Sequence, residues 1–211
     1  MERQTVHLFV CQRFSDWEPG YVLPMLNDPM RGYRVQTVGV SREPVKTAGG
    51  LTILPDLTLA ELEPAQSAML ILPGSGVWAQ GNYPEAIEKA KAFLAAKVPV
   101  AAICGATAGL ALAGLLDDRP HTSNAREYLQ ALGYRGEAFY QDQLVVTNGD
   151  LITANATAPL TLPTIFSTSC RCTVRVCLMP GMVCLQPMIQ RTFSRGSKQQ
   201  RRSVQTFRHL R

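Results

Sequence analysis

Residues 98–114 read VPVAAICGATAGLALAG, an apolar run that leads through a Cys-Gly pair into an alanine-rich segment. The apolar run predicts a short buried strand, and the alanine-rich part predicts a helix. A strand that turns so abruptly into a helix requires small residues around the turn. Ala102 and Ala106 stand two residues before and two residues after Cys104. The segment therefore predicts a strand–turn–helix unit of an α/β fold, with a thiol on the turn.

Cys104 is a candidate nucleophile because of this position. The N-terminus of the following helix carries a partial positive charge, which favours a thiolate and predicts a pKa below that of an ordinary cysteine. The alternative is a structural thiol, since free cysteine often packs in protein cores as a small apolar residue. The combination of a strand end, small flanking residues and a following glycine favours the nucleophile-elbow interpretation.

Strand-like and helix-like segments alternate through the first 160 residues, which predicts an α/β fold with a mostly parallel sheet. The continuous apolar run at 67–72 is typical of a central strand buried on both faces. Gly49 and Gly50 lie between strand-like residues and predict a hairpin at 47–54 that extends the sheet. Besides these and the Cys104 unit, we expect strands at residues 5–10, 33–40, 121–123, 144–147 and 151–154, and helices at 16–26, 84–96 and 125–132.

Polar or reactive residues directly follow three of the predicted strands. Asp16 is expected to cap the first helix, which carries Glu18. Gly74 and Ser75 follow the central strand, and Cys104 follows the next one. In sheets of this kind ligands bind outside the carboxyl ends of the strands. One site is therefore expected to collect Glu18, the Gly74-Ser75 turn and Cys104.

The composition is that of a globular protein, with 46% hydrophobic and 18% charged residues among 211. This length is enough for one domain with a core of its own. No apolar run approaches the ~20 residues that span a membrane, and the first residues lack the pattern of a signal peptide. We therefore expect a cytoplasmic protein that does not contact membranes, and in which Cys104 is reduced.

Charge divides the chain near residue 160. Residues 1–160 hold 12 Lys and Arg against 16 Asp and Glu, a net charge of −4. Residues 161–211 hold nine Lys and Arg, no acid and four of the six cysteines. We expect an α/β domain at 1–160 and an atypical basic, Cys-rich tail at 161–211.

The tail offers little support for a metal or nucleic-acid site. Its C-x-C-x4-C-x6-C spacing lacks the paired C-x-x-C of zinc sites, so we expect no metal. It also lacks interleaved aromatic residues, so nucleic acid is not the expected partner. No Gly-x-x-x-x-Gly-Lys phosphate loop occurs in the chain, and we expect no cofactor.

Four motifs occur in the order in which a known family has them. They are Asp16-Trp-Glu-Pro, Ile71-Leu-Pro-Gly, Ala102-Ile-Cys-Gly-Ala-Thr and Thr153-Ala-Asn-Ala-Thr-Ala-Pro-Leu. Over residues 5–160 the chain resembles the ThiJ/PfpI family, which belongs to the DJ superfamily and is similar to class I glutamine amidotransferases. The resemblance implies a flavodoxin-like three-layer sandwich with a mostly parallel sheet, a cysteine nucleophile elbow and a homodimer.

The resemblance also implies roles for individual residues. Cys104 matches the family's reactive cysteine, and Glu18 matches the glutamic acid that shares a proton with it. The alternative for Glu18 is a first-turn glutamate that the helix dipole favours. The backbone N–H groups of Ser75 and Gly105, next to Gly74, match the family's oxyanion pocket.

Histidines distinguish this chain from several family members. Where many members place a histidine near the thiol, this chain has Asn124, and His121 lies three residues earlier. We expect His121 to be structural, with a role as a base as the alternative, and His7 to be a core residue. Protease-like members carry a histidine directly after the cysteine, where Gly105 stands, and no His-x-Glu pair of glutaminases occurs. Glutaminase chemistry is therefore not expected, and peptidase chemistry has weak support.

Two functions remain open, with a third less favoured. The first is an enzyme of glyoxalase or hydrolase type, in which the Cys104 thiolate attacks the carbonyl of a small molecule and Glu18 is the proton partner. The second is a redox-sensing or stress-response protein in which Cys104 is oxidised to sulfinic acid. The third is an intracellular cysteine peptidase.

Residues 161–211 do not resemble the C-terminus of the family, in which an amphipathic helix follows the Thr-Ala-Pro-Leu motif. The motif is intact at 157–160, but Pro163 falls in the first turns of the expected helix. We expect residues 161–211 to form a mobile appendage, or to replace the family's helix in a way that leaves part of the sheet surface exposed. One hypothesis is a shifted reading frame in the gene after Leu160, and the alternative is a genuine basic tail that docks on a partner. A helix that begins Glu-Phe in another frame would establish the shift, and its absence together with protease resistance of the tail would contradict it.

Overall fold

The computed structural model describes residues 3–158, 177–179 and 182–184. Its strands are β1 (Gln4–Phe9), β2 (Tyr33–Gly39), β3 (Val45–Lys46), β4 (Thr52–Ile53), β5 (Leu57–Thr58), β6 (Met69–Leu72), β7 (Val100–Ile103), β8 (Val145–Asn148), β9 (Leu151–Ala154), β10 (Cys177–Met179) and β11 (Met182–Cys184). Its α-helices are α1 (Trp17–Gly20), α2 (Val22–Leu26), α3 (Pro84–Ala95), α4 (Ala106–Leu112) and α5 (Arg126–Gln130). Its 3-10 helices are η1 (Pro29–Arg31), η2 (Pro64–Gln66), η3 (Trp78–Gln80) and η4 (Glu137–Phe139).

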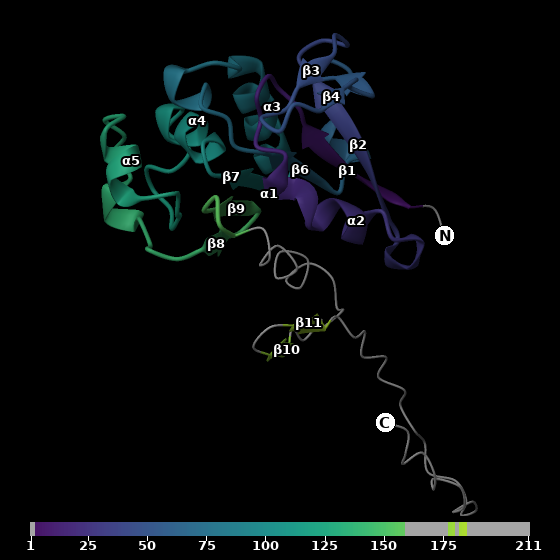
Figure 1. Cartoon of the computed structure of the whole chain (residues 1–211). Helices are drawn as coiled ribbons and strands as arrows, with labels where there is room; N and C mark the ends of the chain where they lie inside the picture. Colours follow the sequence, from purple (N-terminus) through teal and green to yellow (C-terminus); the bar gives the residue numbers. More distant parts are fainter. Residues whose placement is uncertain (1–2, 159–176, 180–181, 185–211) are drawn as a thin grey trace, which may run out of the picture. The chain divides into compact units, whose positions relative to one another are not determined.

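Seven strands form one sheet in the order β5-β2-β1-β6-β7-β9-β8, within which only β8 runs antiparallel to its neighbour (Figure 1). The predicted α/β fold with a mostly parallel sheet is confirmed. The chain moves from β1 to β2 on one side and later returns to β6 on the other, so the strand order reverses between β1 and β6. Sheets of this class form a ligand crevice at such a reversal, outside the carboxyl ends of the strands. Strands β10 and β11 form a separate antiparallel pair.

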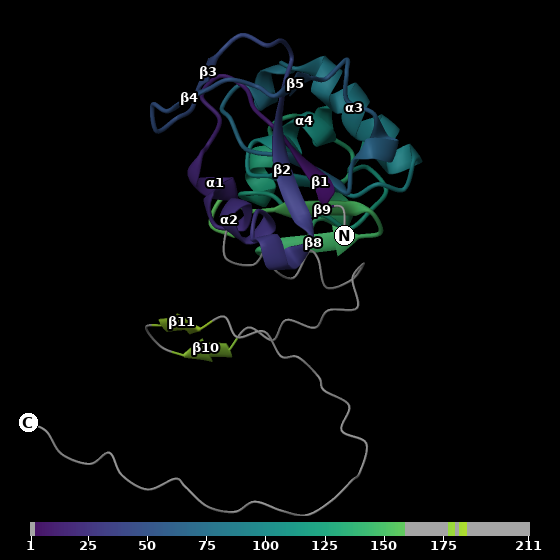
Figure 2. The same ribbon diagram turned by 90° about the vertical axis from the view of Figure 1, so that its right-hand side faces the viewer.

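Helices cover both faces of the sheet. Helices α1 and α2 lie on one face, and α3 and α4 lie on the other (Figure 2). Right-handed crossovers that run in opposite directions from the β1–β6 reversal produce this arrangement. The central strands β6, β7 and β9 are buried along their whole length, as their apolar sequences predict.

The predicted hairpin at 47–54 is wrong in one respect, because it does not extend the sheet. Strands β3 and β4 pair only with each other among the described strands. Asp16 does not cap its helix. Its carboxylate instead accepts hydrogen bonds from the Thr47 hydroxyl (2.6 Å) and the Gly49 N–H (3.2 Å). Asp16 therefore ties this hairpin to the start of α1, the helix that carries Glu18.

Two other predicted elements are shorter than expected. The helix predicted at 16–26 is divided into α1 and α2. Pro24 lies in the second part and has no N–H to donate to the carbonyl four residues earlier, so the helix cannot be continuous there. The strand predicted at 121–123 is a single bridge between His121 and Tyr140.

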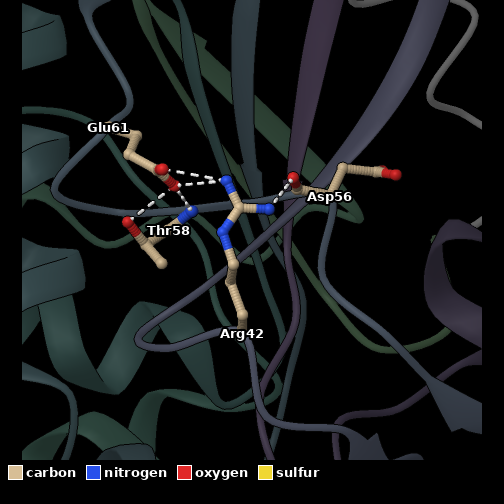
Figure 3. A network of polar contacts seen from close by, with 4 residues as sticks. All are labelled: Arg42, Asp56, Thr58 and Glu61. Atoms are coloured by element: carbon tan, nitrogen blue, oxygen red, sulfur yellow. Dashed lines mark hydrogen bonds and ion pairs between the residues drawn. The ribbon is translucent and has the colours of Figure 1, made fainter.

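A polar network connects the loop after β2 with the edge strand β5 and the residues around it (Figure 3). The Arg42 guanidinium donates to the Asp56 carbonyl (2.7 Å) and to both carboxylate oxygens of Glu61 (2.8 and 3.0 Å). The N–H and hydroxyl groups of Thr58 donate to the same Glu61 carboxylate. These contacts lower the pKa of Glu61 to about 2, and the hydrogen bond from Arg42 has the largest effect. The network is structural and lies on an exposed surface, where such pairs contribute little to stability.

His7 is the core residue that the sequence predicts. Its side chain is 3% exposed, and its Nδ1 lies 2.8 Å from the Ser67 hydroxyl oxygen. Burial, and then the positive charge of Arg34, lower the pKa of His7 to about 4. The folded protein therefore holds this imidazole neutral at every pH above about 4.

We expect His7 to make the fold sensitive to acid. The unfolded chain binds its proton near pH 6.5 and the folded chain only near pH 4, so this contribution to stability is present above pH 6.5 and lost as the pH falls toward 4. Between pH 7 and pH 5 the loss is about 2 kcal/mol. Urea unfolding at both pH values should show a smaller loss in His7→Asn. An equal loss in both proteins would contradict the prediction.

No helix among the described residues is long and apolar enough to cross a membrane. Of the tail at 161–211, the structure describes only the β10–β11 pair, in which Cys177 lies opposite Cys184. The conformation predicted for the rest of the tail lies outside the described residues.

Candidate functional site

Cys104 occupies the turn between β7 and α4, as the sequence predicts. Its φ angle is +54°, in the left-handed region that non-glycine residues rarely adopt. The Cys104 N–H donates to the Ala154 carbonyl (2.8 Å), and the Thr107 hydroxyl donates to the Cys104 carbonyl (2.6 Å). The backbone on both sides of the turn is therefore held in place. Strained backbone at a strand–helix turn is typical of a nucleophile elbow.

Two glycines permit the close packing around this turn. A Cβ on Gly74 would stand 2.5 Å from Glu18 Oε1, 2.7 Å from Cys104 Cβ and 3.0 Å from Cys104 Sγ. A Cβ on Gly105 would stand 2.5 Å from the Ser75 carbonyl oxygen. Any larger residue would push these groups apart. The predicted gathering of Glu18, the Gly74-Ser75 turn and Cys104 is thus present in the structure.

Glu18 lies on the buried side of the sulfur. Its side chain is fully buried, and its Oε2 accepts a hydrogen bond from the Gly74 N–H (2.6 Å). Its Oε1 has no well-formed hydrogen bond within the described residues and faces the Cys104 thiol across Gly74. The Ser15 N–H donates to the Gly74 carbonyl (2.7 Å) and joins the loop after β1 to the loop after β6. This carboxyl is therefore placed for exchange with the thiol, not with solvent.

Cys104 and Glu18 affect each other's titration. Burial raises the pKa of Glu18, and the Gly74 N–H and the nearby Cys104 and Ser15 side chains oppose that rise. Burial and then the negative charge of Glu18 raise the pKa of Cys104 to about 11, against hydrogen bonds from the Asn124 amide and the Gly105 N–H. Two acids in such contact release their protons in two steps that belong to the pair. The pair therefore keeps at least one proton at neutral pH.

The prediction of a lowered pKa for Cys104 is wrong. It considered only the N-terminus of α4, a helix of seven residues. Burial and the facing carboxylate outweigh that dipole because both disfavour a second negative charge. The Cys104 thiol therefore holds its proton more firmly than an ordinary cysteine does, and Glu18 is the group positioned to take that proton.

Two backbone N–H groups lie in the loops beside Cys104, because the Ser75 N would stand 3.1 Å from a Cβ built on Gly105. The Gly105 N–H contacts Cys104, and the Ser75 N–H donates to no acceptor within the described residues. The Ser75 hydroxyl donates to the Gln12 carbonyl (3.2 Å), and the Trp78 indole donates to the Pro73 carbonyl (3.0 Å). Both contacts fix the loop that carries the Ser75 N–H. The Ser75 and Gly105 N–H groups are those that the family resemblance assigns to an oxyanion pocket.

Asn124 contacts the sulfur directly. Its Nδ2 donates to Cys104 Sγ (3.1 Å), and its Oδ1 accepts from the Ala156 N–H (3.0 Å). The neighbouring Ser123 is buried, and its hydroxyl lies 2.6 Å from that of Thr107. The position that the resemblance assigned to a histidine thus carries a hydrogen-bond donor that does not titrate.

His121 points away from the sulfur. It is fully buried, with Nδ1 2.9 Å from the Arg119 carbonyl oxygen and Nε2 3.1 Å from the Tyr134 hydroxyl. Its ring also packs edge-on against Tyr134 and Tyr140. Its alternative role as a base is therefore not supported, and the structural interpretation agrees with these contacts.

We expect His121→Ala to weaken the fold more than the chemistry. The change removes a buried ring and leaves two hydrogen-bonding groups without a partner, which should cost about 2–3 kcal/mol of unfolding free energy. Reactivity of Cys104 in the folded protein should fall by less than about tenfold, because the ring does not contact the sulfur. Chemical denaturation and Cys104 alkylation, measured on the same sample, check both statements. A larger loss of reactivity in a folded variant would make His121 a functional residue.

Two further residues complete the surroundings. Cys11 is buried, and burial raises the pKa of its thiol to about 12, so it matches the predicted core thiol. Tyr128 of α5, which the sequence interpretation missed, is half-buried and lies close enough to Cys104 for their charges to interact. No sequence pattern marks Tyr128, because only the packing of α5 brings it near the site.

The sequence profile of the DJ-1/PfpI family matches residues 4–165. The chain belongs to the DJ-1/PfpI family. This agrees with the resemblance found over residues 5–160, and the match ends close to the change in composition near residue 160.

Relatives of this DJ-1/PfpI protein include two from Bacillus subtilis. The protein named "Uncharacterized protease YoaZ" is 38% identical over 168 residues, which cover 76% of this chain and 80% of that protein. The protein named "Uncharacterized protease YdeA" is 32% identical over 156 residues, which cover 72% of this chain and 75% of that protein.

Crystal structures of other family members share the fold. A ThiJ/PfpI family protein from Bacillus anthracis has a TM-score of 0.71 and 38% identity, over 78% of this chain and 84% of that one. A DJ-1 superfamily protein from Agrobacterium tumefaciens has a TM-score of 0.71 and 32% identity, over 80% of this chain and 89% of that one. The DJ-1 superfamily fold is therefore shown for this chain.

Proposed function

We propose that this DJ-1/PfpI protein converts small reactive carbonyl compounds through covalent attack by Cys104, with Glu18 as the proton carrier. The observation that carries the proposal is the placement of a strained, partly exposed thiol between a fully buried carboxyl and two backbone N–H groups. This arrangement supplies a nucleophile, a base for its proton and donors for a developing oxyanion. Among the residues that the structure describes, no other titrating group hydrogen-bonds to the sulfur.

The first step adds the sulfur to an aldehyde. As the S–C bond forms, the thiol proton of Cys104 passes to Glu18, and the π electrons of the carbonyl move to its oxygen. The N–H groups of Ser75 and Gly105 stabilise that oxygen until Glu18 returns the proton, which gives a hemithioacetal. No oxidant or reductant is consumed.

With a 2-oxoaldehyde the reaction can proceed further. The proton on the former aldehyde carbon moves through the Glu18 carboxylate to the neighbouring carbonyl carbon, while the hydroxyl proton moves to the neighbouring oxygen. The product is a 2-hydroxy thioester. Water hydrolyses it to a 2-hydroxy acid, and the thiol is restored.

A turnover assay with methylglyoxal tests the proposal. We expect the wild-type protein to consume methylglyoxal and release lactate, and to show a transient mass increase of one substrate molecule on the peptide that contains Cys104. Absence of both consumption and adduct would refute the proposed function.

A second candidate function is redox sensing by the same sulfur. Glu18 Oε1 faces Cys104 without a well-formed hydrogen bond, and a protonated Glu18 could donate to a sulfinate oxygen there. The thiolate would reduce one peroxide to water to give sulfenic acid, and a second peroxide would give sulfinic acid. Titration to two equivalents of peroxide, followed by intact mass and peptide mapping, should then show two added oxygens on Cys104, whereas Cys11 should remain unmodified.

Peptidase activity, which the names of the two Bacillus subtilis relatives suggest, has less support in this chain. Neither His7 nor His121 contacts the sulfur, since their imidazoles bind Ser67 and Tyr134. The third histidine, His209, lies outside the described residues.

A further inference from the structure

The orientation of the Asn124 amide is fixed by its surroundings. Its Oδ1 accepts from the Ala156 N–H (3.0 Å), so the Nδ2 end must face the sulfur (3.1 Å). The Asn155 amide donates to the Asn124 carbonyl (3.3 Å) and holds the backbone from the same side. Asn124 is exposed, whereas Glu18 on the other side of the sulfur is fully buried. A substrate that arrives from solvent therefore meets the side of the sulfur on which Asn124 stands.

The groups that titrate near the sulfur are few within the described residues. Glu18 of α1 faces it from the buried side. Tyr128 of α5 interacts with its charge, and burial raises the pKa of that phenol above its ordinary value of 10, so it keeps its proton at neutral pH. Arg126 of the same helix donates to carbonyls of η4 and of Tyr140. On the open side, the group in contact with the sulfur is an amide that neither gains nor loses a proton.

We propose that Asn124 determines the specificity of this site: it supports the sulfur with a fixed N–H donor on the open side and thereby restricts the protein to carbonyl compounds whose conversion expels no amine. The inference rests on the proposed function and narrows its substrate class.

The restriction follows from proton balance. In attack on an aldehyde, the new bond is S–C, the carbonyl oxygen takes one proton, and nothing leaves. In attack on a peptide, the C–N bond must break as well, and the nitrogen must be protonated before it leaves as an amine. The group that contacts the sulfur on the open side is the Asn124 amide, whose N–H is too weak an acid to protonate a departing nitrogen. Glu18 faces the sulfur from the buried side and returns its proton to the carbonyl oxygen, so the described residues provide no second acid on the open side.

Alkylation of Cys104 by iodoacetamide, followed by peptide mapping, measures the contact of Asn124 with the sulfur without using a substrate. Asn124→Ala removes a donor to the thiolate and should slow alkylation at pH 8 about tenfold. Asn124→Asp keeps the shape and the acceptor for Ala156 but places a negative charge at the sulfur, so it should be slower still. Asn148→Asp makes the same charge change at the end of β8 and should stay within about twofold of wild type.

The pH dependence provides a signature that a merely structural residue would not produce. Asn124→His places a titrating group against the sulfur and should add an inflection near pH 6–7 to the alkylation profile, which the wild type lacks. If Asn124→Ala, Asn124→Asp and Asn124→His all alkylate like wild type, the inferred role is wrong.

Hydrolysis of fluorescent casein tests the restriction itself. We expect wild type and Cys104→Ser to be equally inactive. Casein hydrolysis by wild type that is lost in Cys104→Ser would overturn the inference. Failure of the proposed function is a separate result, because it appears as absence of methylglyoxal consumption while the order of the alkylation rates is unaffected.

Discussion

Cys104→Ser is expected to abolish turnover of methylglyoxal. A serine hydroxyl is a far weaker nucleophile than a thiol and much harder to deprotonate, so the rate should fall by about 10³-fold or more. Serine nearly preserves the size of the side chain, so the elbow and its contacts should persist. The measurement is lactate release per protein at saturating methylglyoxal.

Cys11→Ala is the matched control for this change. Cys11 is a buried thiol whose pKa is raised to about 12, and it has no part in the proposed reaction. Its variant should keep turnover within about threefold of wild type, provided that it folds. Equal losses in both variants would show that the assay reports general stability and not the chemistry of Cys104.

Glu18→Gln is expected to reduce turnover by about 10²–10⁴-fold, the usual contribution of a positioned acid–base group. Glutamine keeps the shape of the buried side chain, but it cannot take the thiol proton or return it to the adduct. Steady-state kinetics should show the loss in kcat, because the change removes proton transfer and not substrate binding. A Glu18→Gln variant with wild-type kcat would show that the carboxyl only begins a helix.

Most of the fold could be predicted because each central element has a strong local signal. The apolar runs of β6 and β7 can only be buried strands, and the small residues around Cys104 indicate the turn between β7 and α4. The prediction that the hairpin at 47–54 extends the sheet failed because this hairpin binds the Asp16 side chain, which lies in another loop. Asp16 binds Thr47 and Gly49, and no local sequence pattern predicts a contact between residues more than thirty positions apart.

The residues of the site could be predicted from the sequence, but the direction of the Cys104 pKa shift could not. The rule that ligands bind at the carboxyl ends of parallel strands brought Glu18, Ser75 and Cys104 together. The sign of the Cys104 pKa shift required burial and the facing carboxylate, which appear only after folding. Likewise, only the folded chain shows that Asn124 faces the sulfur and that His121 does not.

Several expectations stay predictions. The homodimer implied by the family resemblance is one, and the division into an α/β domain at 1–160 and a tail at 161–211 is another. The tail hypothesis depends on the gene, because most of these residues lie outside the described part of the chain.

The central claim is that Cys104 and Glu18 share one proton, and the pH dependence of Cys104 alkylation in wild type and Glu18→Gln tests it most directly. Burial, and then repulsion by the Glu18 carboxylate, raise the pKa of Cys104 to about 11, so the wild-type rate should still be rising at pH 10. Glu18→Gln removes that charge, so its midpoint should be lower and its alkylation at pH 8 faster, although its turnover is lost. A wild-type profile that is already flat at pH 7, or a midpoint that Glu18→Gln leaves unchanged or raises, would contradict the account.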